Sequence, residues 1–336
     1  MDGMTIILTA GIVGSATLLP MKFVRDWKWE NTWLLYSLLA YFVCPLAVAW
    51  HTIPSLLSVY EAAGWPVLIQ VGLFGFGWGV SVVMLGLAVA AVGLAVSNGI
   101  ILGCSIAIGS LVPLLILDPG HLLTADGIRI IVADVIILSG VLLCARAGYL
   151  REIIEVDEQG KKGMGKRGIL LCFVAGILTP LFNLALTSGS GISDLAVAHG
   201  ALPHDAANSV WGLAVSAGAL PSIFYCILLL NRNRSWNSFT TSGSSRNAIL
   251  CFVMAACFMA ATVGYGMGAL KMGRLGPVVG WPVYISSLIL GNSFWGWCTG
   301  EWKGAPRSSV LIMWAGLLSQ VVGIALLFAG GSSAGS

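Results

Sequence analysis

Long apolar stretches separated by short polar connections run through the whole chain. At about 20 residues for each membrane crossing, this pattern predicts ten transmembrane helices. Their expected ranges are 3–20, 33–50, 66–87, 93–116, 128–145, 168–187, 209–230, 247–270, 275–297 and 308–330. Backbone polar groups in lipid must be hydrogen-bonded within the protein, and apolar spans of this length satisfy them as helices rather than as barrel strands. The pattern therefore predicts an all-α integral membrane protein.

One strongly polar segment, residues 146–167, divides these spans into five before it and five after it. An odd number of spans in each half makes the second half insert in the opposite orientation. We therefore expect two inverted five-helix repeats, an architecture of many secondary transporters. The predicted parts are an N-terminal half at 1–145, a cytoplasmic linker at 146–167 and a C-terminal half at 168–336.

Two glycine-rich stretches, 74–113 and 263–297, share a pattern that supports this repeat. Gly86 and Gly93 of the first stretch are matched 180 residues later by Gly266 and Gly273. Small residues let membrane helices approach closely. We expect each stretch to form a helical hairpin, and the two hairpins either line a pathway or serve only to pack the bundle.

The composition agrees with lipid as the solvent. Hydrophobic residues make up 57% of the chain and charged residues only 9%, against roughly 25% charged residues in soluble domains. No basic run indicates a nucleic-acid partner. The eight cysteines fall in apolar stretches without the spacing of a zinc site or a disulfide framework. No nucleotide loop or metal-ligand motif is recognisable, so we expect no cofactor, no metal and no ATP-driven pump.

Lysine and arginine are concentrated in alternate connections, which predicts the orientation in the membrane. The connections after the first, fifth, seventh and ninth spans hold most of the 17 basic residues. These are Lys22, Arg25, Lys28, Arg146, Arg151, Lys161, Lys162, Lys166, Arg167, Arg232, Arg234, Arg246, Lys303 and Arg307. We therefore place the odd-numbered connections in the cytoplasm and both termini outside.

Four groups of residues follow one another in a distinctive order among the spans. They are Pro20, Lys22, Trp27, Trp29, Glu30 and Trp33; Phe74, Gly75, Trp78, Gly79, Gly86, Leu87 and Gly93; Arg146, Ala147, Gly148, Arg151 and Glu152; and Glu301, Trp302 and Arg307. In this order the chain resembles the L-rhamnose–proton symporter family of the drug/metabolite transporter superfamily. The resemblance implies proton-coupled uptake of L-rhamnose or a similar 6-deoxyhexose across the bacterial inner membrane by a multi-pass protein that is not an enzyme.

Aromatic and amide side chains inside the spans are the candidates for binding a sugar. Hydroxyl groups require amides and hydroxyls as partners, while the C–H faces of a sugar pack on flat rings. We expect five residues to face a central cavity: Trp78, Asn98, Asn183, Trp281 and Asn292. The alternative for each asparagine is a hydrogen bond that joins two helices, and for each tryptophan it is an anchor at the membrane interface.

Proton coupling requires a titratable group that contacts both sides in turn. Asp134 is the acidic residue well inside a span, and an ionised aspartate there costs about 2.5–3.5 kcal/mol. Its alternatives are a carboxylic acid in contact with outer water or a partner of Arg129. Glu30 is the second candidate, and its alternative is a partner of Lys22 or Lys28 near the lipid headgroups.

The pattern therefore predicts a secondary active transporter in the lipid bilayer, and the resemblance implies a small sugar and a proton as its partners. A carrier or exporter of another small polar solute is the alternative, and a membrane receptor without transport is a more distant one. The sequence shows no cluster of acidic residues or histidines at one depth of the membrane, so we do not expect an enzyme. The choice of sugar, the coupling ion and the oligomeric state stay open at this point.

Overall fold

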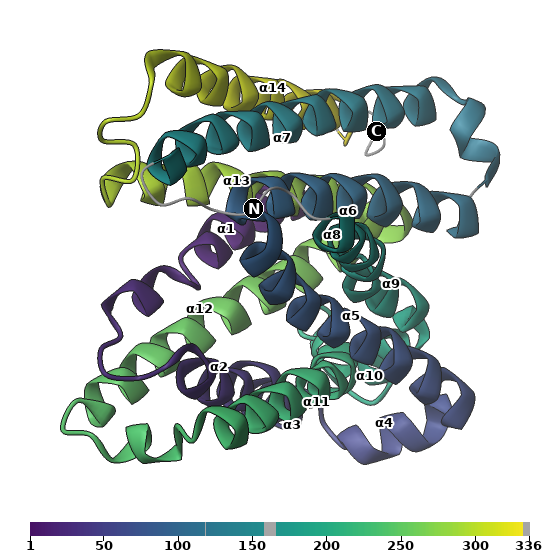
Figure 1. Ribbon diagram of the computed structural model, residues 1–336. Coiled ribbons are helices and arrows are strands. Elements are labelled where there is room, and N and C mark those ends of the chain that lie inside the picture. Colours follow the sequence, from purple (N-terminus) through teal and green to yellow (C-terminus); the bar gives the residue numbers. More distant parts are fainter. Residues whose placement is uncertain (118, 158–165, 332–336) are drawn as a thin grey trace.

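The protein is a bundle of long helices, seen here in a computed structural model that describes residues 1–117, 119–157 and 166–331 (Figure 1). No strand occurs in these ranges. The first half consists of α1 (Gly3–Ser15), η1 (Leu19–Phe23), α2 (Trp29–Ser37), η2 (Leu38–Val43), α3 (Cys44–Thr52), α4 (Leu56–Ala63), α5 (Trp65–Val92), α6 (Leu94–Leu117), η3 (Pro119–Leu123) and α7 (Ala125–Asp157). The second half consists of α8 (Lys166–Leu178), α9 (Leu181–Ser188), α10 (Ser190–Ala198), α11 (Asn208–Asn233), η4 (Trp236–Thr240), α12 (Ser244–Lys271), η5 (Gly273–Leu275), α13 (Gly276–Cys298) and α14 (Arg307–Gly331).

Nine helical segments of the described chain are long and apolar enough to cross a membrane. They correspond to nine of the ten expected spans and confirm the all-α class. The expected span at 275–297 coincides with α13, which is a helix of 23 residues but not one of the nine. Tryptophan, proline, serine and asparagine lower its hydropathy. Most of α13 is buried among other helices, so it has little need of the apolar surface that lipid demands.

The two hairpins expected from the repeated glycines are present. α5 turns into α6 at Gly93, and α12 turns into α13 through Gly273. The two glycines have φ values of 86° and 70°. Glycine adopts these angles without steric cost because it has no Cβ. The matched positions therefore serve the same turn in each half.

Proline explains the irregular helix in the second span. Pro45 has no N–H group, so the carbonyl four residues earlier loses its usual donor. The chain responds with the π-helical turn η2, in which the Cys44 N–H donates to the Leu39 carbonyl. Such turns are frequent at functional sites, and this one places Tyr41 in the interior.

Close helix pairs organise the bundle. α7 lies along α14 over most of its length, and α5 packs against α11 (Figure 1). α1 packs against α12 and α13, while α8 packs against α5 and α6. Gly75 and Gly79 of α5 lie directly on the backbone of Ala214 and Gly218 in α11. The absence of side chains at these glycines allows the close α5–α11 approach.

Adding a methyl group to this contact should destabilise the protein. A Cβ at Gly79 would lie only 2.7 Å from the Gly218 Cα, so Gly79→Ala is expected to lower the free energy of unfolding by about 1–3 kcal/mol. The measurement is thermal unfolding of the purified protein in detergent. Gly72→Ala on the same helix is the matched control, because a Cβ there would meet nothing within 4 Å. Equal melting temperatures for the two variants would contradict the close packing.

Candidate functional site

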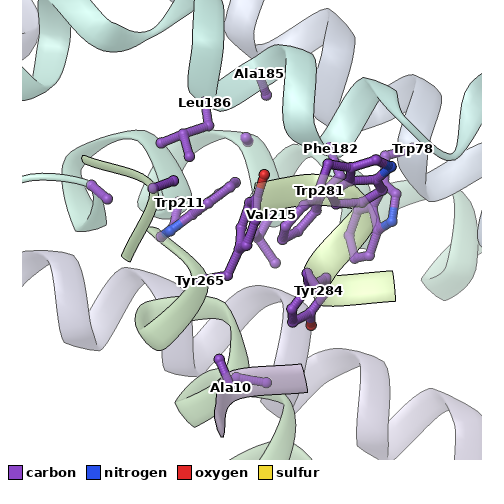
Figure 2. Close-up of a cluster of buried hydrophobic side chains, with 14 of the residues drawn as sticks. Ala10, Trp78, Phe182, Ala185, Leu186, Trp211, Val215, Tyr265, Trp281 and Tyr284 are labelled. Carbon is purple, nitrogen blue, oxygen red and sulfur yellow. The ribbon is translucent and has the colours of Figure 1, made fainter. Parts of the chain in front are cut away.

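Aromatic side chains from both halves meet in the middle of the bundle. The members of this central aromatic cluster are Tyr36, Tyr41, Trp78, Phe182, Trp211, Phe258, Tyr265, Trp281 and Tyr284. Figure 2 shows Trp78, Phe182, Trp211, Tyr265, Trp281 and Tyr284 of this cluster. Neighbouring ring centroids lie between 4.5 Å, for Phe182 and Trp211, and 6.4 Å, for Phe182 and Tyr265. These are the separations of favourable aromatic pairs.

Trp78 and Trp281, both predicted from the sequence to face a cavity, belong to this cluster. Their exposed fractions are 8% and 2%, so neither ring has the exposed surface that an anchor in lipid headgroups requires. The Trp281 Nε1–H donates to the Ser105 carbonyl at 3.0 Å. Its indole fills the space beside Gly109, where a side chain would collide with it.

Asn183 connects four helices at the edge of the cluster. Its Nδ2 group on α9 donates to the Gly109 carbonyl of α6 at 2.8 Å and to the Pro277 carbonyl of α13 at 3.0 Å. Its Oδ1 accepts a hydrogen bond from the Tyr265 hydroxyl of α12. Pro113 has no N–H to offer the carbonyl four residues before it, which is that of Gly109. Asn183 therefore supplies the donor that Pro113 lacks.

Several polar atoms of the surrounding helices are buried without a hydrogen-bond partner in the described part of the chain. Those on helices of the cluster include Trp33 Nε1, Ser37 Oγ, Trp211 Nε1, Thr262 Oγ1 and Ser286 Oγ. Buried polar groups are normally satisfied, and exceptions indicate water, a ligand or a conformational role. Aromatic faces with unpaired hydroxyl and indole donors are the groups that a small polyol requires.

Asn98 and Asn292, the other two predicted substrate residues, lie apart from the cluster. They line a cavity of about 160 Å³ between α6, α7, α13 and the connection from α13 to α14. The remaining lining residues include Cys144, Arg151, Ser293, Glu301 and Trp302. We call this space the α6–α7–α13 cavity. The structure thus divides the five predicted residues into a central group of three and a group of two toward one end of the bundle.

Asp134, the first proton-coupling candidate, is buried on α7 with 7% of its surface exposed. Neither carboxylate oxygen has a hydrogen-bond donor among the described residues. Ser110 of α6 is the polar side chain that faces it, without hydrogen-bond geometry. Arg129 does not pair with Asp134, because its guanidinium lies 2.9 Å from Asp126. The carboxylate therefore has no counter-charge in the described structure.

Glu30, the second candidate, has a different environment. Its Oε1 accepts hydrogen bonds from Asn233 Nδ2 at 2.9 Å and from Ser235 Oγ at 2.7 Å. Lys28 instead donates to the Asn233 carbonyl and Lys22 pairs with Glu301, so neither lysine considered from the sequence is the direct partner of Glu30. Glu30 joins the start of α2 to the end of α11.

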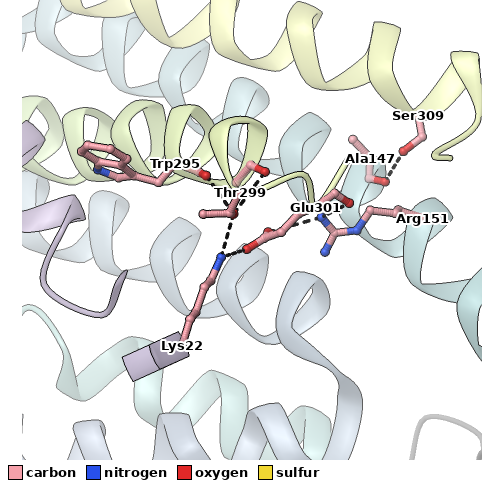
Figure 3. Close-up of polar contacts among 8 residues, drawn as sticks. Lys22, Ala147, Arg151, Trp295, Thr299, Glu301 and Ser309 are labelled. Atoms are coloured by element: carbon pink, nitrogen blue, oxygen red, sulfur yellow. Dashed lines mark hydrogen bonds and ion pairs between the residues drawn. The ribbon is translucent and has the colours of Figure 1, made fainter. Parts of the chain in front are cut away.

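A group of charged residues lies near the α6–α7–α13 cavity, and it was not identified as a site from the sequence. Glu301 forms ion pairs with Lys22, which follows α1, and with Arg151 of α7 (Figure 3). The Lys22 Nζ group also donates to Thr299 Oγ1 at 2.9 Å, and the Arg151 guanidinium lies 5.0 Å from the Trp302 ring. All three charged residues belong to the motifs that resemble the symporter family. Their placement in three connections assigned to one membrane face was the signal that pointed to a shared location.

A bundle of apolar helices with aromatic rings, amides and an unpaired carboxylate in its interior defines a multi-pass membrane protein of the transporter class. The sequence profile of the L-rhamnose-proton symport protein (RhaT) family matches residues 3–333, and the chain belongs to that family. The resemblance inferred from the motifs is thereby confirmed.

Three relatives illustrate the similarity. The L-rhamnose-proton symporters of Citrobacter koseri, Escherichia coli strain 55989 and Cronobacter sakazakii are 23%, 23% and 24% identical to the chain over 310 residues. The alignments cover 90% of this chain and 90% of each relative. These relatives are named as symporters and not as enzymes, in agreement with the prediction that the chain is a transporter.

Proposed function

We propose that the protein takes up L-rhamnose, or a closely similar 6-deoxyhexose, together with a proton by alternating access. The observation that carries this proposal is the family match, which extends from residue 3 to residue 333. The interior supports it, because the central aromatic cluster offers ring faces to a small polyol and the surrounding helices bury the unpaired hydroxyl groups of Ser37, Thr262 and Ser286.

The proposed architecture is ten membrane-spanning helices in two inverted halves, with α13 as the ninth span, followed by α14 as the tenth. The packing partners support it, since α1 contacts α12 and α13 as α8 contacts α5 and α6. The glycines follow the same correspondence. Gly3 at the start of α1 lies against Met272, which follows α12. Gly168 in the first turn of α8 lies against Val92, which ends α5 and precedes Met272 by 180 positions.

The contact between α7 and α14 supports the same symmetry. Ser139 and Ser319 are separated by 180 residues and lie 3.1 Å apart through their hydroxyl groups. In a structure with a pseudo-twofold axis, matched residues of the two halves meet only on the axis. We place the axis through this pair, with 1–145 and 168–336 as the related halves and 146–167 as their cytoplasmic linker.

We place the odd-numbered connections in the cytoplasm and both termini outside the bacterial inner membrane. The support is the distribution of Lys and Arg along the chain. The connections after α1, α11 and α13, which are rich in these residues, lie on the left in Figure 1, opposite η3 and α4. A reporter active only outside the cytoplasm, fused after Ser336, should be active. If the reporter is inactive there and active only when it is fused to a chain truncated in an odd-numbered connection, the opposite orientation is correct.

For the site, we propose that Trp78, Asn183 and Trp281 contact the sugar at the centre and that Asn98 and Asn292 contact it nearer the cytoplasm. Asn183 uses its hydrogen bonds on α6, α12 and α13 in the conformation described. Sugar binding to Asn183 therefore requires α9 and these helices to move relative to one another. Asp134 is the proposed proton carrier, and Glu30, with two hydrogen bonds of its own, is the second choice.

Counterflow in proteoliposomes tests this function. Vesicles preloaded with unlabelled L-rhamnose should accumulate labelled L-rhamnose transiently, and an inward proton gradient should drive net uptake from empty vesicles. L-Fucose tests other 6-deoxyhexoses, and mannitol tests polyols in general. Counterflow of a panel member without L-rhamnose counterflow would assign the protein to another solute. Counterflow without any response to the proton gradient would remove the coupling.

A further inference from the structure

The α6–α7–α13 cavity contains polar groups that the protein leaves unpaired. The carboxamides of Asn98 and Asn292 make no hydrogen bond to another described residue, although both line the cavity. Arg151 Nε is buried there without an acceptor in the described chain. An amide can both donate and accept, so these side chains suit a ligand that carries several hydroxyl groups.

Charge and an aromatic surface close one side of the same cavity. Glu301 lies between Lys22 and Arg151, and Trp302 lies beneath the Arg151 guanidinium. The volume of about 160 Å³ corresponds to roughly five water molecules at ~30 Å³ each. A monosaccharide is the class of ligand that combines this small size with hydroxyl groups.

Glu301 is placed to control access to this space. It belongs to the connection between α13 and α14, while its partners belong to η1 and α7 of the other half. The side chains of Lys22 and Glu301 are 42% and 38% exposed. Exposed ion pairs contribute only about 0–1 kcal/mol, so such a contact can open and close during a transport cycle.

We propose that the α6–α7–α13 cavity is a second monosaccharide subsite, occupied as sugar leaves toward the cytoplasm, and that Glu301 closes it by pairing with Lys22 and Arg151. The proposal rests on the proposed transport function and on the orientation given with it. The central aromatic cluster then binds sugar first, and the carboxamides of Asn98 and Asn292 receive it before release.

Two native cysteines allow a test in the intact protein. Cys144 lines the cavity, whereas Cys298 is exposed and outside it. Inside-out vesicles are treated with N-ethylmaleimide, and the labelled peptides are quantified by mass spectrometry. L-Rhamnose at ten times its dissociation constant should slow alkylation of Cys144 about tenfold by occupancy and leave Cys298 unchanged. Mannitol should protect neither cysteine.

Variants separate the two parts of the proposal. Asn98→Ala and Asn292→Ala should each raise the L-rhamnose concentration for half-protection about two- to tenfold, the effect of one lost hydrogen bond. Glu301→Gln should speed alkylation of Cys144 without sugar by up to about fivefold. Asn237→Ala on η4, an exposed amide far along the chain from the cavity residues, is the matched control and should alter neither rate.

Efflux kinetics provide a reading that does not depend on Cys144. Asn98→Ala should raise the half-saturating L-rhamnose concentration for transport from the cytoplasmic face by the same factor, with normal protein levels. If wild-type protein performs L-rhamnose counterflow but shows no Cys144 protection and no efflux change in Asn98→Ala, the subsite is wrong. If wild-type protein shows no L-rhamnose counterflow at all, the failure lies with the proposed function.

Discussion

Asp134→Asn is expected to abolish proton-driven accumulation of sugar while sugar counterflow continues. Asparagine has nearly the same shape as aspartic acid but does not bind and release a proton. Asp134 is buried on α7, and its oxygens have no donor among the described residues. A change of charge at such a depth alters the energy by about 2.5–3.5 kcal/mol, or on the order of 100-fold in an equilibrium. The steady-state sugar gradient should therefore fall to the level of passive equilibration.

The measurement is uptake of labelled sugar into proteoliposomes under an imposed pH gradient, with counterflow measured on the same preparation. Asp126→Asn is the matched control, because this exposed aspartate on the same helix pairs with Arg129. It should retain coupled uptake. Undiminished accumulation in Asp134→Asn would exclude Asp134 as the proton carrier and direct attention to Glu30.

Asn183→Ala is expected to lower the amount of folded protein sharply. The substitution removes the donor to the Gly109 and Pro277 carbonyls and the acceptor of the Tyr265 hydroxyl. Because the site is buried, leaving these groups unpaired should cost about 2–5 kcal/mol in the free energy of unfolding. The measurements are protein level in the membrane and thermal unfolding of the purified protein in detergent.

Two comparisons distinguish packing from substrate binding at Asn183. Asn98→Ala should fold normally, because Asn98 makes no hydrogen bond to another described residue. Asn183→Asp replaces both donors by a carboxyl oxygen that faces the Gly109 and Pro277 carbonyls, so this variant of nearly equal shape should be at least as unstable as Asn183→Ala. Normal folding of Asn183→Ala with a raised half-saturating sugar concentration would contradict the bridging role and leave sugar binding as the role of Asn183.

Much of the fold follows from local sequence, because each segment that crosses the bilayer must by itself be long and apolar enough to do so. The expected span at 66–87, for example, lies within α5 (Trp65–Val92), and the expected span at 93–116 differs from α6 (Leu94–Leu117) by one residue at each end. The hairpin of 74–113 was also predicted from the repeated glycines, and the structure places its turn at Gly93, which like Gly273 has a positive φ. The span at 275–297 is less clear because packing against neighbouring helices relieves α13 of the need to be uniformly apolar.

The candidate site was only partly predictable. Residue chemistry singled out Trp78, Asn183 and Trp281, and the structure brings all three to the central aromatic cluster or its edge. The same chemistry singled out Asn98 and Asn292, but it carried no sign that they lie together elsewhere. Amides in a membrane span have the same composition signature whether they bind a ligand, join helices or line a cavity, so sequence pattern does not separate these roles.

The sequence alone determined the all-α membrane class and the family, because the lengths of apolar runs and the order of short motifs are properties of the chain in one dimension. The tertiary structure alone decided which polar groups pair with other groups of the protein and which do not. Lys22 and Glu301 meet across 279 residues, and Asn183 supplies the donor that Pro113 denies to Gly109. Such pairings depend on helix packing in three dimensions, where each contact is set by neighbours that lie far away in the chain.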